Sequence, residues 1–226
     1  MIRAVVFDLW NTLVRNPQGD PFQHLQRLLG PGLEASFAEF KRDAMARVHP
    51  DARTLLQDWQ GRLGLTGPQV LDLAAVFREA TATAQCFPES LDTLTRTRKL
   101  ARLALLSNTQ SFDMGFLDRL GLNALVPNRF LSAELGFLKP DPQPFAAVQA
   151  RLGLFPGEIA MVGDSWRDDV AGALDAGWTA IWVNRNGLPR PELDPEEPLV
   201  EVPDLGPVPE IIRNLQAGAR CSTCLG

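Results

Sequence analysis

The sequence has little cysteine, no excess of positive charge and no long apolar run. Its three cysteines among 226 residues, Cys86, Cys221 and Cys224, are an odd number and too few for a disulfide scaffold. That usage favours a reducing compartment. The 22 basic side chains are outnumbered by 27 acidic ones, for a formal net charge of −5. This balance excludes a chain-wide basic surface, so neither nucleic acid nor an anionic membrane is an expected partner.

The lack of long apolar runs excludes two further classes of protein. No stretch approaches the roughly 20 apolar residues that are needed to cross a bilayer. The first apolar run, Ala4–Phe7, meets Asp8 too soon to be the core of a signal peptide. A chain with 45% hydrophobic residues can still bury a core without disulfide bonds. We therefore expect a soluble, cytoplasmic protein with one domain, or one domain with a large insertion.

The few histidines and cysteines do not form a recognisable metal motif. His24 and His49 have no partner at metal-ligand spacing, so surface or packing roles are expected. Cys221 and Cys224 form a lone CxxC pair. A disordered tail is the favoured interpretation of that pair, and half of an intermolecular zinc site is the alternative.

Several continuous apolar runs are typical of strands that are buried on both faces. Helix-length patterns separate the later runs, and two of these patterns end at Gly153 and Gly177, a common stop signal. Strands that alternate with helices indicate a parallel sheet with right-handed crossovers. The predicted strands are Val5–Phe7, Leu103–Leu106, Ile159–Val162 and Thr179–Val183.

The segment that follows the first strand has a different character. It has helical periodicity without strand-like runs, and Pro-Gly, His-Pro and Gly-Pro pairs divide it. We predict an all-helical cap at residues 16–85, inserted into an α/β core made of residues 1–15 and 86–226. The proline-rich tail after Asn186 is predicted to be irregular, with a short helix near Glu210–Arg213.

Polar residues follow the predicted strands at the edge where an open parallel sheet binds ligands. Asp8 follows the first strand, Ser107 and Asn108 the second, and Asp164 the third, with Asp169 five residues further on. In one crevice, one carboxylate can act as a nucleophile, while two more bind a hard cation such as Mg²⁺. Hydroxyl and amide groups would donate hydrogen bonds to an oxyanion, and Lys139 would neutralise its charge.

Four ordered motifs resemble those of the haloacid dehalogenase superfamily of hydrolases, most of which are Mg²⁺-dependent phosphatases. The resemblance extends along nearly the whole chain, and the helical insertion lies where one class of the family has its cap. It implies a Rossmann-like, mostly parallel α/β core and a small phosphorylated substrate. The motifs are Phe7–Leu13, Leu106–Asn108, Lys139–Pro142, and Val162–Ser165 with Asp169.

The resemblance also implies a role for each matching residue. Asp8 would be the nucleophile that becomes an aspartyl-phosphate, with Lys139 offsetting negative charge. The implied ligands of the phosphoryl oxygens are Thr12, Ser107, Asn108 and Lys139. The implied ligands of Mg²⁺ are Asp8, the Trp10 backbone carbonyl, Asp164 and, through a bound water, Asp169.

Trp10 departs from the phosphatase pattern. The phosphatases usually have there a second aspartate that acts as general acid and base, a contribution typically worth ~10²–10⁴ in rate. We therefore predict a slow phosphatase unless another group substitutes. Trp10 and Trp166 are candidate walls of the site, although Trp166 fits a packing role equally well. Asn11 replaces the usual glycine and tolerates a left-handed backbone better than most residues.

Two alternatives to the phosphatase remain. The 2-haloacid dehalogenases have an aromatic residue at the position of Trp10 and need no metal, but they lack the acidic pair that Asp164 and Asp169 form here. Without a cation these carboxylates would repel each other, which favours the phosphatase. The other alternative is a protein that binds a phosphorylated ligand or a partner with little turnover.

Lys41 and Arg42 could reach an anionic substrate, but a solvated helix face is the favoured interpretation. The sequence specifies neither the substrate nor the oligomeric state.

Overall fold

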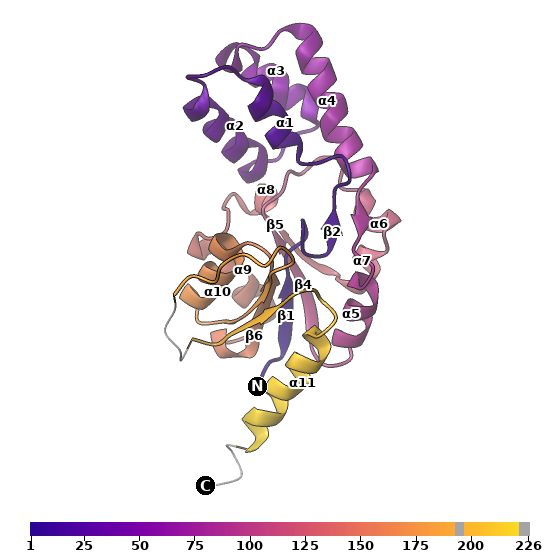
Figure 1. Ribbon diagram of the computed structural model, residues 1–226, viewed down its shortest axis with the longest axis vertical. Helices are drawn as coiled ribbons and strands as arrows, with labels where there is room; N and C mark the ends of the chain where they lie inside the picture. The colour runs from indigo at the N-terminus through magenta and orange to yellow at the C-terminus, as the bar shows by residue number, and fades with distance from the viewer. Residues whose placement is uncertain (193–196, 222–226) are drawn as a thin grey trace.

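The computed structural model describes residues 1–192 and 197–221, and it is built around one six-stranded parallel sheet (Figure 1). The strand order is β5-β4-β1-β6-β7-β8, so β1 lies near the centre. This architecture confirms the predicted α/β, Rossmann-like class. The strands are β1 (Ala4–Phe7), β4 (Arg102–Ser107), β5 (Asn128–Leu131), β6 (Ile159–Gly163), β7 (Thr179–Val183) and β8 (Leu199–Val202).

Helices cover both faces of the sheet, which explains the continuous apolar runs. Along β1, Val5 and Phe7 join one hydrophobic cluster, whereas Ala4 and Val6 join the other. Figure 1 shows α9 and α10 on one side and α5, α6, α7 and α11 on the other. The helices of this part are α5 (Ser90–Thr97), α6 (Phe116–Arg119), α7 (Leu122–Leu125), α8 (Ser132–Leu135), α9 (Pro142–Leu152), α10 (Gly172–Asp175) and α11 (Val208–Cys221), with a 3₁₀ turn η1 (Pro156–Glu158) and a π-helical turn η2 (Trp166–Ala171).

The four predicted strands are confirmed as β1, β4, β6 and β7, and the helix predicted near Glu210–Arg213 is confirmed as part of α11, but the prediction of an irregular segment before it is wrong. Residues Leu199–Val202 form β8 at the edge of the sheet, and α11 extends over 14 residues. The strand is half-exposed and contains Glu201, so it lacks the apolar signature of the central strands. Residues 193–196 of the acidic run, and Cys224 of the CxxC pair, lie outside the described residues.

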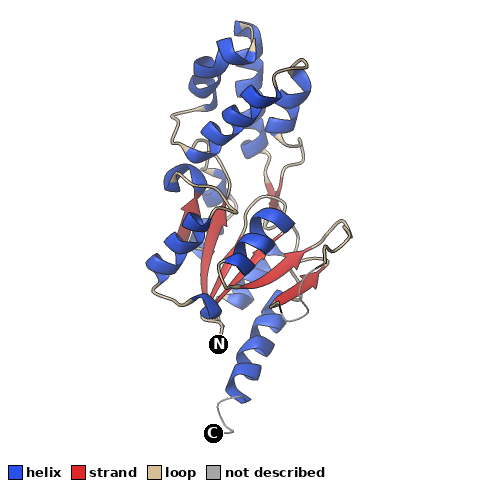
Figure 2. Ribbon diagram, turned by 90° about the vertical axis from the view of Figure 1, so that its left-hand side faces the viewer, coloured by secondary structure: helices blue, strands red, loops and turns tan. Residues whose placement is uncertain are grey.

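Four helices between β1 and β4 form a separate hydrophobic cluster beyond the carboxyl edge of the sheet (Figure 2). The helical periodicity predicted all four. Phe22, Phe40 and Phe77 pack there in tilted or edge-to-face contacts. Asp51 and Thr66 accept hydrogen bonds from backbone N–H groups at the starts of two of these helices. The helices are α1 (Pro21–Leu28), α2 (Glu34–Ala46), α3 (Ala52–Leu63) and α4 (Gly67–Ala82).

The chain enters and leaves this helical cluster through two short strands. β2 (Val14–Arg15) and β3 (Gln85–Cys86) pair antiparallel, with Val14 opposite Cys86. The predicted division at residues 16–85 has its ends at this strand pair, and it stays a prediction. No helix among the described residues is both long enough and apolar enough to span a membrane.

Candidate active site

A cavity of about 410 Å³ lies between the carboxyl edge of the sheet and helices α1, α2 and α4. Its volume is in the usual range of small-molecule sites. Two predicted site residues, Thr12 and Trp166, are not among the residues that line it. The predicted residues that do line it are Asp8, Trp10, Ser107, Asn108, Lys139, Asp164 and Asp169.

Three carboxylates meet at the floor of this cavity. Asp8 follows β1, Asp164 follows β6 and Asp169 lies in η2, and one oxygen of each lies within 4.8 Å of the others. Burial, and then the charge of Asp8, raise the pKa of Asp164 to about 7. Burial likewise raises the pKa of Asp169 to about 7, against the opposing effect of Lys139. Crowded carboxylate oxygens of this kind suit a hard divalent cation, which would favour their ionised forms.

Lys139 links two of these carboxylates. Its side chain is 2% exposed, and Nζ donates to Asp8 Oδ1 at 2.8 Å and to Asp169 Oδ1 at 2.5 Å. A third hydrogen bond goes to the backbone carbonyl of Leu106 at 2.9 Å. Burial opposes the charge, but the carboxylates of Asp169 and Asp8 together raise the pKa of Lys139 above its ordinary value. The lysine is therefore a fixed cation beside the candidate nucleophile.

The Asn108 side chain holds the lysine segment in place. Its Nδ2 donates to the carbonyl of Lys139 at 2.8 Å, and its Oδ1 accepts from the Lys139 N–H at 2.8 Å. Asn108 thus positions Lys139. The second N–H of Nδ2 has no partner in these hydrogen bonds and Asn108 lines the cavity, so the predicted contact with phosphoryl oxygens stays a prediction.

Thr12 does not line the cavity, and its predicted contact with phosphoryl oxygens stays a prediction. Its side chain is fully buried, and Oγ1 donates to Asp164 Oδ1 at 3.1 Å instead of facing the cavity. The cause is the tight loop after β1, in which Asn11 has a φ of 61° and Leu13 N–H bonds back to the Leu9 carbonyl at 3.0 Å. The left-handed backbone expected at Asn11 is confirmed. Thr12 orients a carboxylate of the acidic cluster.

Ser107 offers a free hydroxyl at the end of β4. Among the described residues its Oγ is buried without a hydrogen-bond partner, and the residue lines the cavity. A buried polar group without a partner is costly, so a ligand oxygen at this point would satisfy it.

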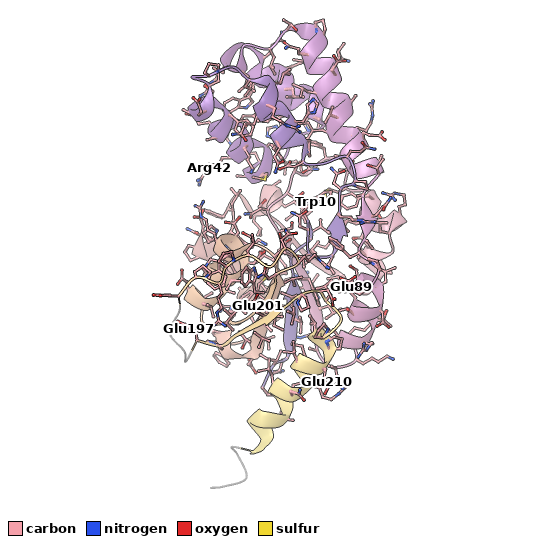
Figure 3. The ribbon with its side chains drawn as sticks, viewed as in Figure 1. Trp10, Arg42, Glu89, Glu197, Glu201 and Glu210 are labelled. Carbon is pink, nitrogen blue, oxygen red and sulfur yellow. The ribbon has the colours of Figure 1, made fainter. Side chains whose placement is uncertain are left out.

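The two tryptophans have different surroundings. The Trp10 indole Nε1 donates to Thr109 Oγ1 at 3.1 Å, and its ring centroid lies 5.2 Å from that of Phe116. Trp10 lines the cavity, and Figure 3 shows it between the sheet and the helices above. Trp166 packs edge-to-face on Trp182 at 4.8 Å, so the packing interpretation applies to it and the wall interpretation does not.

Arg185 does not line the cavity, but it supports the loop after β1, and the sequence analysis missed it. It follows β7, and its guanidinium donates to the backbone carbonyls of Asn11 at 3.3 Å and Thr12 at 3.1 Å. It also pairs with Glu89 at 2.7 Å and lies 3.7 Å from the ring centroid of Phe87. The arginine therefore joins the loop after β1 to the segment where the chain returns from the helices. A single arginine outside any motif gave no sequence signal for this contact.

The close approach of β6 to η2 depends on Gly163. A Cβ atom there would lie 2.3 Å from Cγ of Asp169, far inside van der Waals contact. We expect Gly163→Ala to lower the free energy of unfolding by about 1–3 kcal/mol, as overpacking typically does, and to displace the Asp169 carboxylate. Urea denaturation measures the loss. Gly157→Ala, where a Cβ meets nothing within 4 Å, is the control, and equal midpoints for the two variants would contradict the prediction.

Comparisons with known proteins identify the family. The family model described as haloacid dehalogenase-like hydrolase matches residues 2–177. A phosphoserine phosphatase from Thermus thermophilus is 39% identical over 193 residues, which cover 82% of this chain and 76% of the relative. A glyceraldehyde 3-phosphate phosphatase from Methanopyrus kandleri is 28% identical over an alignment that covers 95% of this chain and 99% of the relative. The crystal structure of a 2-haloacid dehalogenase from Pseudomonas syringae pv. Tomato is similar at a TM-score of 0.69 and 26% identity, covering 95% of this chain and 99% of that one. The chain belongs to the family of haloacid dehalogenase-like hydrolases.

Proposed function

We propose that this hydrolase is a Mg²⁺-dependent phosphatase that acts on a small phosphomonoester through an aspartyl-phosphate on Asp8. The observation that carries the proposal is the cluster of Asp8, Asp164 and Asp169, with Lys139 bonded to two of its members, at the floor of a cavity of small-molecule size. The relatives named as phosphatases support it. The cytoplasmic location predicted from the cysteine content stays a prediction.

The residues present fit a Mg²⁺ ion. Asp8, Asp164 and the backbone carbonyl of Trp10 would supply oxygen ligands directly, and Asp169, whose two oxygens accept hydrogen bonds from Lys139 and Ser165, would act through a bound water. When bound, the ion would offset the repulsion between the carboxylates and an incoming phosphate dianion.

In the proposed reaction, a carboxylate oxygen of Asp8 forms a bond to phosphorus while the bond from phosphorus to the leaving alcohol oxygen breaks. The ammonium of Lys139 and the unpartnered hydroxyl of Ser107 stabilise the phosphoryl oxygens. Water then attacks the aspartyl-phosphate, releasing inorganic phosphate and restoring the carboxylate. The Trp10 side chain can neither protonate the leaving alcohol nor deprotonate the water, so we expect slow turnover of alkyl phosphates.

Two parallel assays test the proposal. We expect release of nitrophenol from p-nitrophenyl phosphate with Mg²⁺ and none with a chelator, because the aryl leaving group needs little protonation. Halide release from 2-chloropropionate that persists in chelator would instead establish the dehalogenase, for which the aromatic Trp10 in the cavity wall is the supporting observation. Binding of phosphorylated ligands without product in either assay would establish the non-catalytic alternative.

Removal of Mg²⁺ should make stability depend on pH. Asp164 and Asp169 have pKa values of about 7 in the fold and 3.8 as the ordinary value, so the native state binds more protons than the unfolded chain between about pH 4 and pH 7. The free energy of unfolding then falls as pH rises through this window. In chelator we expect the thermal midpoint to fall between pH 5 and pH 8, and we expect Mg²⁺ to restore it most at pH 8. Asp164→Asn should flatten this dependence, and a midpoint in chelator that is constant with pH would contradict the prediction.

A further inference from the structure

Lys41 is a cation of the cavity that none of the proposed chemistry uses. It lies on α2, is half-buried and lines the same cavity as Asp8. Among the described lining residues, only Lys41 and Lys139 are cationic. Lys139 is bonded to two carboxylates, whereas Lys41 forms no ion pair with any described residue, and its Nζ lies 5.8 Å from the ring centroid of Phe22. The sequence analysis favoured a solvated helix face for Lys41 and Arg42; Arg42 is exposed, whereas Lys41 is half-buried and lines the cavity.

Two contacts of the residues that follow Lys41 hold this part of α2 against the part of the chain that contains the sheet. The backbone carbonyl of Met45, one turn further along, accepts a hydrogen bond from Ser132 Oγ at 2.5 Å. Arg42 lies 3.9 Å from Asp141, and Figure 3 shows it at the end of the helical cluster that faces the sheet. Met45 also lines the cavity, as expected for a residue four positions after Lys41 on one helix face. The ammonium of Lys41 is therefore presented to the cavity from the side opposite the carboxylate cluster.

A lysine that lines a cavity and forms no ion pair there is available to bind an anionic ligand. The carboxylate cluster and Lys139 would hold the phosphoryl group, so the anion that meets Lys41 would be another group of the same molecule. A single ammonium matches the single charge of a carboxylate.

We propose that Lys41 binds a carboxylate of the substrate, and that the preferred substrates are small phosphomonoesters that carry a carboxylate. This inference rests on the proposed phosphatase function. The competing role for Lys41 is to balance the charge of Asp168, which also lines the cavity. Burial raises the pKa of Asp168, and the positive charge of Lys41 is one of the effects that oppose this rise. That role would make Lys41 equally important for every phosphate ligand, which separates the two roles experimentally.

The test uses two ligands that differ only at one end: 3-phosphoglycerate, with a carboxylate, and glycerol 3-phosphate, with a hydroxymethyl group. Each is measured in Mg²⁺ as a competitor of p-nitrophenyl phosphate turnover and, independently of turnover, by calorimetry in the Asp8→Asn background. We expect the protein to prefer 3-phosphoglycerate, and Lys41→Met to reduce that preference about 10- to 100-fold, the usual effect of losing a charged hydrogen bond. Lys41→Arg should retain the preference.

Arg42→Met is the matched control, because it removes the neighbouring cation, which is 71% exposed and lies beside Asp141. This variant should keep the preference for the carboxylate. Equal weakening of both ligands in Lys41→Met, or equal affinity of the native protein for the two, would overturn the inference. If calorimetry shows the preference while aryl phosphate is not turned over, the proposed function fails and the carboxylate site stands.

Discussion

Asp8→Asn should eliminate the burst of nitrophenol that the native protein releases when it is mixed rapidly with p-nitrophenyl phosphate and Mg²⁺. In the native protein we expect a burst of about one equivalent followed by slow turnover, because the aspartyl-phosphate forms readily and is then hydrolysed without help from Trp10. Asparagine has nearly the same shape as aspartate but lacks the nucleophilic carboxylate. We expect turnover to fall at least ~10³-fold, as removal of a nucleophile typically causes.

The geometry around Asp8 makes this substitution a specific test. The residue is buried at the end of β1, and Lys139 donates to its Oδ1 at 2.8 Å. Asparagine can still accept that hydrogen bond through its side-chain oxygen, so the fold around Lys139 should persist. Asp168→Asn is the control, because Asp168 lines the same cavity but lies outside the three-carboxylate cluster. A burst that survives in Asp8→Asn would mean that another group attacks phosphorus.

The absence of a burst in the native protein would have two different meanings. Brisk steady turnover without a burst would show that some other group replaces the missing aspartate, so that the second step is no longer limiting. No release at all would refute the phosphatase, and halide release from 2-chloropropionate would then be the next measurement.

Buried elements of the fold could be predicted from the sequence, and edge elements could not. β1 is covered on both faces, so its residues are all apolar and its signal is unambiguous. β5 and β8 lie at the two edges of the sheet and include half-exposed or polar residues such as Asn128 and Glu201. Their strand conformation depends on pairing with β4 and β7, which a local pattern does not contain.

The sequence indicated which loops carry the site residues, but not which hydrogen bonds their side chains form. Strand order indicated that Asp8 and Asp164 would meet at the carboxyl edge, because parallel strands end at one edge of the sheet, and the family resemblance added Lys139. The hydrogen bonds of Thr12 to Asp164 and of Asn108 to Lys139 depend on which way each side chain turns inside the folded loops. Contacts of this kind are determined by neighbours that are distant in sequence.

Trp10→Asp should raise steady-state turnover of alkyl phosphates by about 10²-fold, by restoring a group that can protonate the leaving alcohol and activate water. The position already lines the cavity, two residues after Asp8. Nearby carboxylates and partial burial should raise the pKa of the introduced acid and keep part of it protonated, as a general acid requires. The burst on p-nitrophenyl phosphate should change little, because an aryl leaving group does not need the proton.

The substitution also removes packing, so its benefit must be separated from its structural cost. The Trp10 indole contacts Phe116 and donates to Thr109, and deletion of a fully buried tryptophan typically costs about 3–5 kcal/mol. The cost here should be smaller because Trp10 is only half-buried. Trp10→Asn is the control, since it opens the same space without a carboxylate. If asparagine raises turnover as much as aspartate does, the tryptophan limits access to the site and the missing proton transfer does not limit the rate. A gain confined to aspartate, with a pH dependence that the native protein lacks, would locate the handicap in proton transfer.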